Sequence, residues 1–88
     1  MGSYSLRFKT AAEKDLRKLP KDILLRVFQV AEALVDDPFP HQTSKLTGTD
    51  RLYRIRVGDY RIVYEVEARA REITVHHIRH RREVYRNL

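Results

Sequence analysis

Apolar and polar side chains alternate along residues 53–66, "YRIRVGDYRIVYEV", on both sides of Gly58-Asp59. Such alternation is typical of half-buried β-strands, and Gly-Asp suits a two-residue hairpin turn because glycine tolerates a positive φ. The pattern predicts a hairpin that places Arg56 opposite Arg61 and Arg54 opposite Val63. Its apolar face carries Tyr53, Ile55, Val57, Tyr60, Ile62 and Tyr64. Its other face carries Arg54, Arg56, Arg61, Val63 and Glu65.

Helical spacing replaces this alternation before the hairpin. Thr10 and Glu13 form a Thr-x-x-Glu capping box, which predicts a helix that starts near Ala11 and stops around Leu19-Pro20. A second helix follows and ends at Asp36-Asp37-Pro38. Its apolar side chains recur three and four residues apart, which places them on one stripe. The stripe consists of Ile23, Val27, Val30, Ala31 and Leu34, widened by Leu24, Phe28 and Val35.

The remaining segments complete an α+β pattern. "YSLRF" (4–8) and "REITVHHI" (71–78) alternate as strands, and "FPHQTSKLTGTD" (39–50) has the composition of a loop. The predicted order is β-α-α-β-β-β in a single domain of residues 1–88. Two consecutive helices before a β-meander favour two N-terminal helices packed on one face of a small, mainly antiparallel sheet. The arginine face of the hairpin then points away from the helices.

Charge is unevenly distributed along the chain. The net charge is +6, and residues 51–88 contain ten arginines and no lysine. Arginine presents a forked set of donors that matches phosphate oxygens, so this half of the chain favours a nucleic-acid partner. The alternative is a basic surface that reflects a bias toward arginine. The absence of cysteine excludes disulfides and thiolate chemistry and fits a cytoplasmic protein, and no apolar run is long enough to cross a membrane.

The arginine face is the first candidate site. The direct pairing of Arg56 with Arg61 is unfavourable by a few tenths of a kcal/mol or more, so a bound anion would stabilise this face. The alternative is a solvated strand face with Glu65 and other acids nearby. On the last strand we expect His76 on the arginine side and His77 at the core or its rim. Neighbours on a strand point to opposite faces, so the two histidines are not expected to share a metal ion.

The basic tail is the second candidate. Arg79, His80, Arg81 and Tyr85 either form a solvated tail anchored by the tyrosine or return beside the sheet and complete the site. A tyrosine there could stack on a base or pass a proton. The sequence shows no Ser-His-Asp constellation, no acidic metal-ligand cluster in the arginine region and no glycine-rich phosphate loop. An enzyme of this kind would act on RNA without a metal or other cofactor, through attack of a ribose 2′-hydroxyl on the neighbouring phosphate.

Three segments resemble the RelE/ParE toxin superfamily of toxin–antitoxin systems. They are "DLRKLP" (15–20), "KLTGTDRLYRIRVGDYRIVYEV" (45–66) and "HIRHRREVYRNL" (77–88). The RelE-like branch implies a ribosome-dependent endoribonuclease that cleaves mRNA and inhibits translation, with the ribosome, mRNA and a cognate antitoxin as partners. The ParE-like branch, the alternative, implies a DNA gyrase inhibitor without nuclease activity.

The resemblance also implies roles for individual residues. Arg61, Arg81 and Tyr85 match the catalytic positions, although Arg79 fits in place of Arg81 if a small gap is moved. RNA contacts are expected at Arg54, Arg56, Arg79, His80 and Lys45. Some members carry lysine where Arg54 and Arg56 stand, and an arginine cannot give up its proton. The resemblance therefore assigns proton transfer to Tyr85 or His80.

Overall fold

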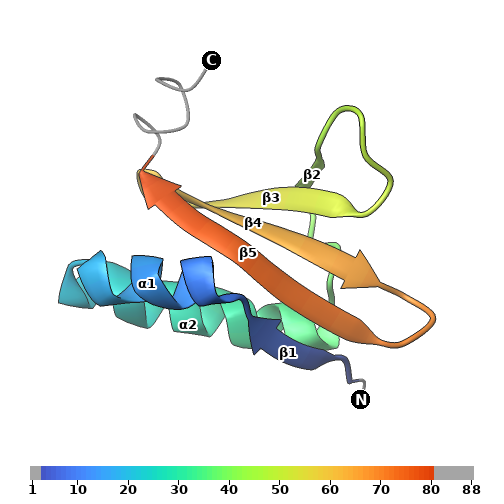
Figure 1. Ribbon diagram of the computed structural model, residues 1–88, viewed down its shortest axis with the longest axis horizontal. Helices are drawn as coiled ribbons and strands as arrows, with labels where there is room; N and C mark the ends of the chain where they lie inside the picture. The colour runs from blue at the N-terminus through green and yellow to red at the C-terminus, as the bar shows by residue number, and fades with distance from the viewer. Residues whose placement is uncertain (1–2, 81–88) are drawn as a thin grey trace.

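The computed structural model describes residues 3–80 (Figure 1). The elements are β1 (Ser5–Phe8), α1 (Thr10–Lys18), α2 (Lys21–Asp36), β2 (Ser44–Lys45), β3 (Leu52–Val57), β4 (Tyr60–Glu67) and β5 (Glu72–His80). Neither of these helices is long and apolar enough to cross a membrane.

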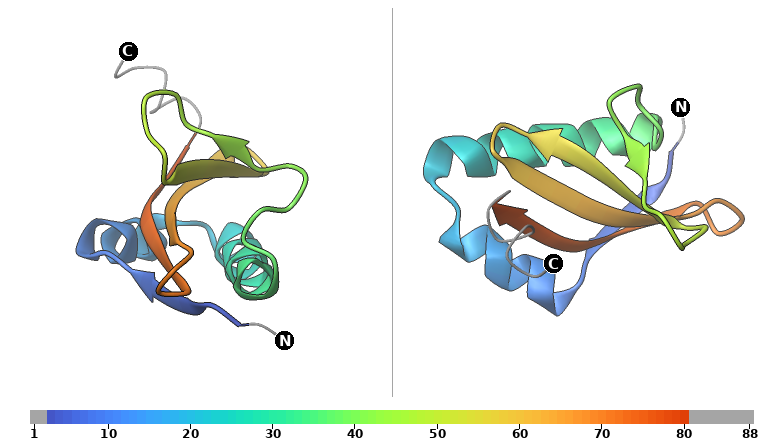
Figure 2. Two further views of the ribbon diagram at one scale, coloured as in Figure 1. Left: turned by 90° about the vertical axis from the view of Figure 1, so that its right-hand side faces the viewer. Right: turned by 90° about the horizontal axis from the view of Figure 1, so that it is seen from above.

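The strands form one sheet in the order β1-β5-β4-β3-β2, and both helices lie on the same side of it (Figure 2). The predicted α+β architecture is confirmed. Two details differ from the prediction. β1 pairs with β5 in parallel, so the sheet is mixed, and residues 44–45 of the predicted loop form β2 beside β3. The parallel pairing is possible because the chain between β1 and β5, which includes both helices and three strands, is long enough for the crossover that parallel strands need.

The capping box predicted for the first helix is wrong. α1 begins at Thr10 itself, its N-cap is Lys9, and no side chain caps it; the backbone N–H of Glu13 donates to the carbonyl of Lys9 instead. The predicted stop is confirmed, since α1 ends at Lys18 and Pro20 is the N-cap of α2. Proline lacks an N–H and fixes φ, so it separates the two helices at this position.

The core lies between the two helices and the inner face of β3, β4 and β5. Val27, Ala31 and Leu34 of the predicted stripe are buried, on the side of the sheet that carries the apolar hairpin face. From that face Ile55, Val57, Ile62 and Tyr64 are buried, while Tyr53 and Tyr60 pack at the margin. Burying each large aliphatic side chain contributes about 1.5–3 kcal/mol, which fixes which face of the hairpin is covered.

A β-bulge in β5 overturns the predicted alternation of the last strand. Val63 pairs with His77, but Tyr64 pairs with Val75, so His76 is an extra residue on β5. After the bulge the faces are exchanged, and Ile78 is buried in the core although strict alternation had placed it on the arginine side. A bulge adds one residue to a single strand, which an alternation pattern alone does not predict.

The edge of β5 beyond β1 is closed by a helix. The backbone N–H of Ile78 donates to Oδ2 of Asp15 on α1, at 2.9 Å. β1 covers β5 only at residues 72–75, so this carboxylate satisfies a donor that would otherwise lie on a free strand edge.

Candidate nucleic-acid interface

The hairpin turn sets the geometry of the site. Gly58 has a φ of +60°, and Asp59 does not share a positive φ, which is the pattern of a II′ turn. The two-residue turn pairs Arg56 with Arg61 and Arg54 with Val63, so the predicted register is confirmed. We call the side of the sheet that faces away from the helices the open face.

β5 extends this arrangement by one strand. Arg61 pairs with Arg79, so Arg56, Arg61 and Arg79 form a line across three strands, which we call the arginine row. The next line across the same strands, which we call the second row, consists of Arg54, Val63 and His77. Directly paired residues share a face, so both rows lie on the open face. The two rows are about 7 Å apart along the strands.

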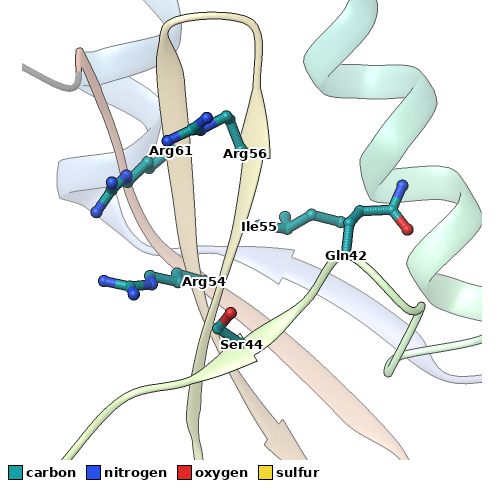
Figure 3. Close-up of a pocket in the computed structure, with 6 residues that line it drawn as sticks. All are labelled: Gln42, Ser44, Arg54, Ile55, Arg56 and Arg61. Atoms are coloured by element: carbon teal, nitrogen blue, oxygen red, sulfur yellow. The ribbon is translucent and has the colours of Figure 1, made fainter.

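The arginines border an open pocket of about 310 Å³ (Figure 3). Its lining residues are Gln42, Ser44, Arg54, Ile55, Arg56 and Arg61. In Figure 3 the side chains of Arg54, Arg56 and Arg61 project to the same side of the hairpin. Ser44 reaches the pocket because β2 pairs it with Arg54, a position that the sequence, read as a loop there, did not indicate.

A buried tyrosine holds the segment that leads into β2. The hydroxyl of Tyr64, which is 0% exposed, donates to the carbonyl of Pro38 at 2.8 Å and lies 2.7 Å from Oγ1 of Thr43. Burial raises the pKa of Tyr64 above its ordinary value, and the hydrogen bond with Thr43 partly opposes this shift. The phenol therefore stays a neutral donor and fixes the approach of the chain to β3.

Carboxylates gather at the opposite end of the open face. Arg51 forms ion pairs with Glu67 and Glu65, and Nε2 of His76 lies 2.9 Å from Oε1 of Glu65. Within residues 3–80, neither Arg54 nor Arg56 forms an ion pair. Positive charge is therefore neutralised at one end of the face and concentrated at the other.

Two of the residues expected to contact RNA lie elsewhere. Lys45 pairs with Tyr53, so it shares the face of Tyr53 and not that of the arginines. His80 pairs with Tyr60 and meets its ring edge-on, with centroids 5.1 Å apart, on the helix side of the sheet. The structure therefore does not bring these two residues to the arginine face, and their contact with RNA stays a prediction. Arg81 and Tyr85 lie outside the described residues.

Both histidines of the bulge lie on the open face, contrary to the expectation that they point apart. His76 reaches Glu65, and His77 is paired with Val63. Burial, followed by the charge of Arg79, lowers the pKa of His77 below its ordinary value, and Asp15 partly opposes the shift. Among residues 3–80 no group of three or more His, Asp or Glu is arranged to hold a metal ion.

The arrangement is suited to binding a polyanion. Four guanidinium groups converge on two adjacent lines of one sheet face, and their mutual repulsion falls when phosphate oxygens bind between them. Fold and face together define a small basic α+β protein whose open sheet surface has the charge that a phosphate chain would need.

Comparison with known proteins gives the family. The model of the family described as "ParE toxin of type II toxin-antitoxin system, parDE" matches residues 6–85. Toxin RelG of Mycobacterium tuberculosis is 33% identical over 90 aligned positions, which cover 94% of this chain and 97% of RelG. This chain therefore belongs to the ParE toxin family of type II toxin–antitoxin systems, within the RelE/ParE superfamily.

Solved structures agree with this assignment. The archaeal RelE–RelB complex from Pyrococcus horikoshii matches with a TM-score of 0.81 at 31% identity, covering 90% of this chain and 96% of the other. The E. coli RelBE toxin–antitoxin complex matches with a TM-score of 0.77 at 26% identity, covering 86% and 94%. The protein is a type II toxin of the RelE type, and the superfamily predicted from the sequence is confirmed.

Proposed function

We propose that this toxin is a ribosome-dependent endoribonuclease that cleaves mRNA and thereby inhibits translation. The observation that carries the proposal is the arginine row, backed by Arg54 in the second row. A transition state for phosphodiester cleavage carries one more negative charge than the ground state, and fixed donors on a rigid sheet stabilise it without reorganising.

The register supports a distribution of roles among the arginines. Arg61 stands at the centre of the row and binds the scissile phosphate, while Arg54 and Arg56 hold the flanking backbone. The second phosphate ligand is Arg79 or Arg81. Arg79 pairs directly with Arg61, which favours it for this role.

The reaction is attack of a ribose 2′-hydroxyl on the adjacent phosphate. It forms a 2′,3′-cyclic phosphate and releases a 5′-hydroxyl, and the need for the 2′-hydroxyl restricts the substrate to RNA. Tyr85 supplies the proton for the departing 5′ oxygen. The proposed scheme assigns no step to a metal ion or other cofactor.

The proposed partners follow from the charge and from the relatives. The RelE structures from P. horikoshii and E. coli are complexes with RelB antitoxin, and we propose a cognate antitoxin for this toxin as well. The ribosome and its mRNA are the proposed cytoplasmic targets. Because the face is strongly positive, binding should weaken steeply as salt rises.

A second candidate function is inhibition of DNA gyrase without chemistry. It is favoured by the description of the matching family model, which is that of ParE toxins. Such a toxin would alter DNA supercoiling and leave transcripts intact.

One pair of assays separates the two functions. A defined message is incubated with the toxin, with and without ribosomes stalled on it, and its 5′ ends are mapped; a gyrase supercoiling assay runs in parallel. The proposal predicts new 5′ ends only with ribosomes and normal supercoiling. Intact mRNA together with inhibited supercoiling would replace it by the second candidate.

A further inference from the structure

The arginines cannot supply the general base that RNA cleavage needs. Something must accept the proton of the attacking 2′-hydroxyl, and a guanidinium cannot do so because it does not lose its own proton near neutral pH. The resemblance suggested Tyr85 or His80, but His80 lies against Tyr60 on the helix side of the sheet. The described part of the open face contains two other imidazoles, His76 and His77.

The bulge brings His77 into the second row. β5 pairs it with Val63, whose other neighbour is Arg54. Two strand spacings separate Arg54 from His77, about 10 Å, and the short apolar side chain of Val63 forms the floor between them. Arg61 and Arg79 of the arginine row lie one line further along. A ribose-phosphate unit placed over Val63 would have guanidinium groups on two sides and an imidazole on the third.

The two histidines of the bulge differ in their partners. His76 is engaged by Glu65 at 2.9 Å. No side-chain hydrogen bond occupies the ring of His77 within residues 3–80, so an unprotonated ring nitrogen there is available as an acceptor.

We propose that His77 is the general base of the RNA cleavage, a role that rests on the proposed function. The imidazole takes the proton of the 2′-hydroxyl as the 2′ oxygen bonds to phosphorus. The bond from phosphorus to the 5′ oxygen breaks, and that oxygen receives the proton of Tyr85. The proton on His77 then returns to the phenolate through solvent, which restores both groups.

The charges around His77 favour an imidazole that is neutral before the reaction. Arg79 and His76 on its own strand disfavour a positive charge on the ring. Arg61 on β4 and Arg54 on β3 are the other cations on this face. Asp15 on α1 acts in the opposite sense, and Glu65 on β4 is the carboxylate on the same face. Burial is the largest effect and also disfavours the charged ring, so the pKa of His77 is lowered. A neutral base at physiological pH is the state that general base catalysis needs.

The test is a pH profile of single-turnover mRNA cleavage on stalled ribosomes, from about pH 5 to 8.5. The wild-type rate should rise with pH and level off, with a midpoint below 6.5, the ordinary pKa of histidine. His77→Gln should lower the plateau rate by about 100- to 10,000-fold and remove the rising limb. In His77→Ala, added imidazole should restore cleavage, with a midpoint near the pKa of free imidazole.

The matched control is His76→Gln, which changes the other histidine of the same bulge. It should keep the rising limb and the plateau, because His76 is held by Glu65 and takes no part in the proton transfer. A His77→Gln protein that retains the rising limb, even at a reduced rate, would overturn the inference and give His77 a structural role.

Failure of the inference and failure of the proposed function give different results. Wild-type protein that leaves the message intact on ribosomes would remove the proposed function, and the role of His77 with it. Wild-type protein that cleaves while His77→Gln cleaves with the same profile would leave the function standing and remove only the general base.

Discussion

The two ends of the open face treat their positive charges differently. At the end far from the hairpin turn, Glu65 and Glu67 neutralise Arg51, and Glu65 also engages His76. At the turn end, Arg56, Arg61 and Arg79 stand side by side, and Arg54 and Arg56 have no ion pair within residues 3–80. Both ends belong to the same three strands, so the demands of the sheet do not explain the contrast. At the far end the positive charges are neutralised by carboxylates of the protein itself, whereas those at the turn end are arranged for an external anion.

The largest expected effect comes from emptying the arginine row. Arg61→Ala combined with Arg79→Ala should reduce ribosome-dependent cleavage at least about 1,000-fold, because each removed donor of this kind typically costs about 100-fold or more. Circular dichroism should show a folded protein, since both side chains lie on the open face.

The matched control for that pair is Arg51→Ala at the neutralised end, which should retain cleavage close to wild type. An equal loss of cleavage in Arg51→Ala and in the double variant would contradict the proposed difference between the two ends. Arg81→Ala, tested alone beside Arg79→Ala, would show which of the two assists Arg61.

The second effect comes from neutralising the turn end. Val63→Glu places a carboxylate between Arg54 and His77, in the floor of the second row. We expect RNA affinity at least about 10-fold below that of Val63→Gln, because the new carboxylate competes with phosphate for the guanidinium groups. The glutamine variant matches the change in size and polarity. Equal affinities, measured by fluorescence anisotropy on a labelled RNA, would contradict the view that this end is a phosphate site.

A smaller effect is expected at the far end. Glu65→Gln weakens the contacts with His76 and Arg51, and should lower the free energy of unfolding by about 1 kcal/mol or less, since the pairs are partly exposed. Cleavage should be unchanged. Urea unfolding gives the first quantity, and the ribosome assay the second; a large loss of cleavage would show that this end also serves the reaction.

The smallest effect is a dependence of stability on pH. The pKa of His77 is lowered in the folded state, mainly by burial and then by Arg79, so the fold favours the neutral ring. This contribution is complete above about 6.5, the unfolded pKa, and declines as pH falls from there toward the lowered folded value. As pH falls from 8 to 5, wild type should therefore lose thermal stability relative to His77→Gln. A difference in Tm that does not change with pH would contradict the shift.

The hairpin shows how much the sequence could predict. Alternation and Gly58-Asp59 determined both the register and the buried face, because a one-residue slip would expose every apolar side chain of the hairpin. The pattern also located both helices and the break at Pro20. These features depend on neighbours in the chain, which a sequence displays directly.

The errors share a different origin. The bulge at His76 and the pairing of Ser44 with Arg54 depend on contacts between distant segments, such as the hydrogen bonds of Tyr64 with Pro38 and Thr43. Strict alternation therefore placed Ile78 on the wrong face and separated the two histidines. The exchange of faces after the bulge also explains why Arg79 lies in the arginine row and His80 does not.

We propose that the turn end of the open face binds RNA and that the far end does not. The most direct test follows the Nε–Hε signals of the arginines by NMR while a short 2′-O-methyl RNA, which cannot be cleaved, is added. We expect shifts for Arg54, Arg56, Arg61 and Arg79, with Arg51 unmoved. Shifts at Arg51 while Arg56 and Arg61 stay in place would contradict it.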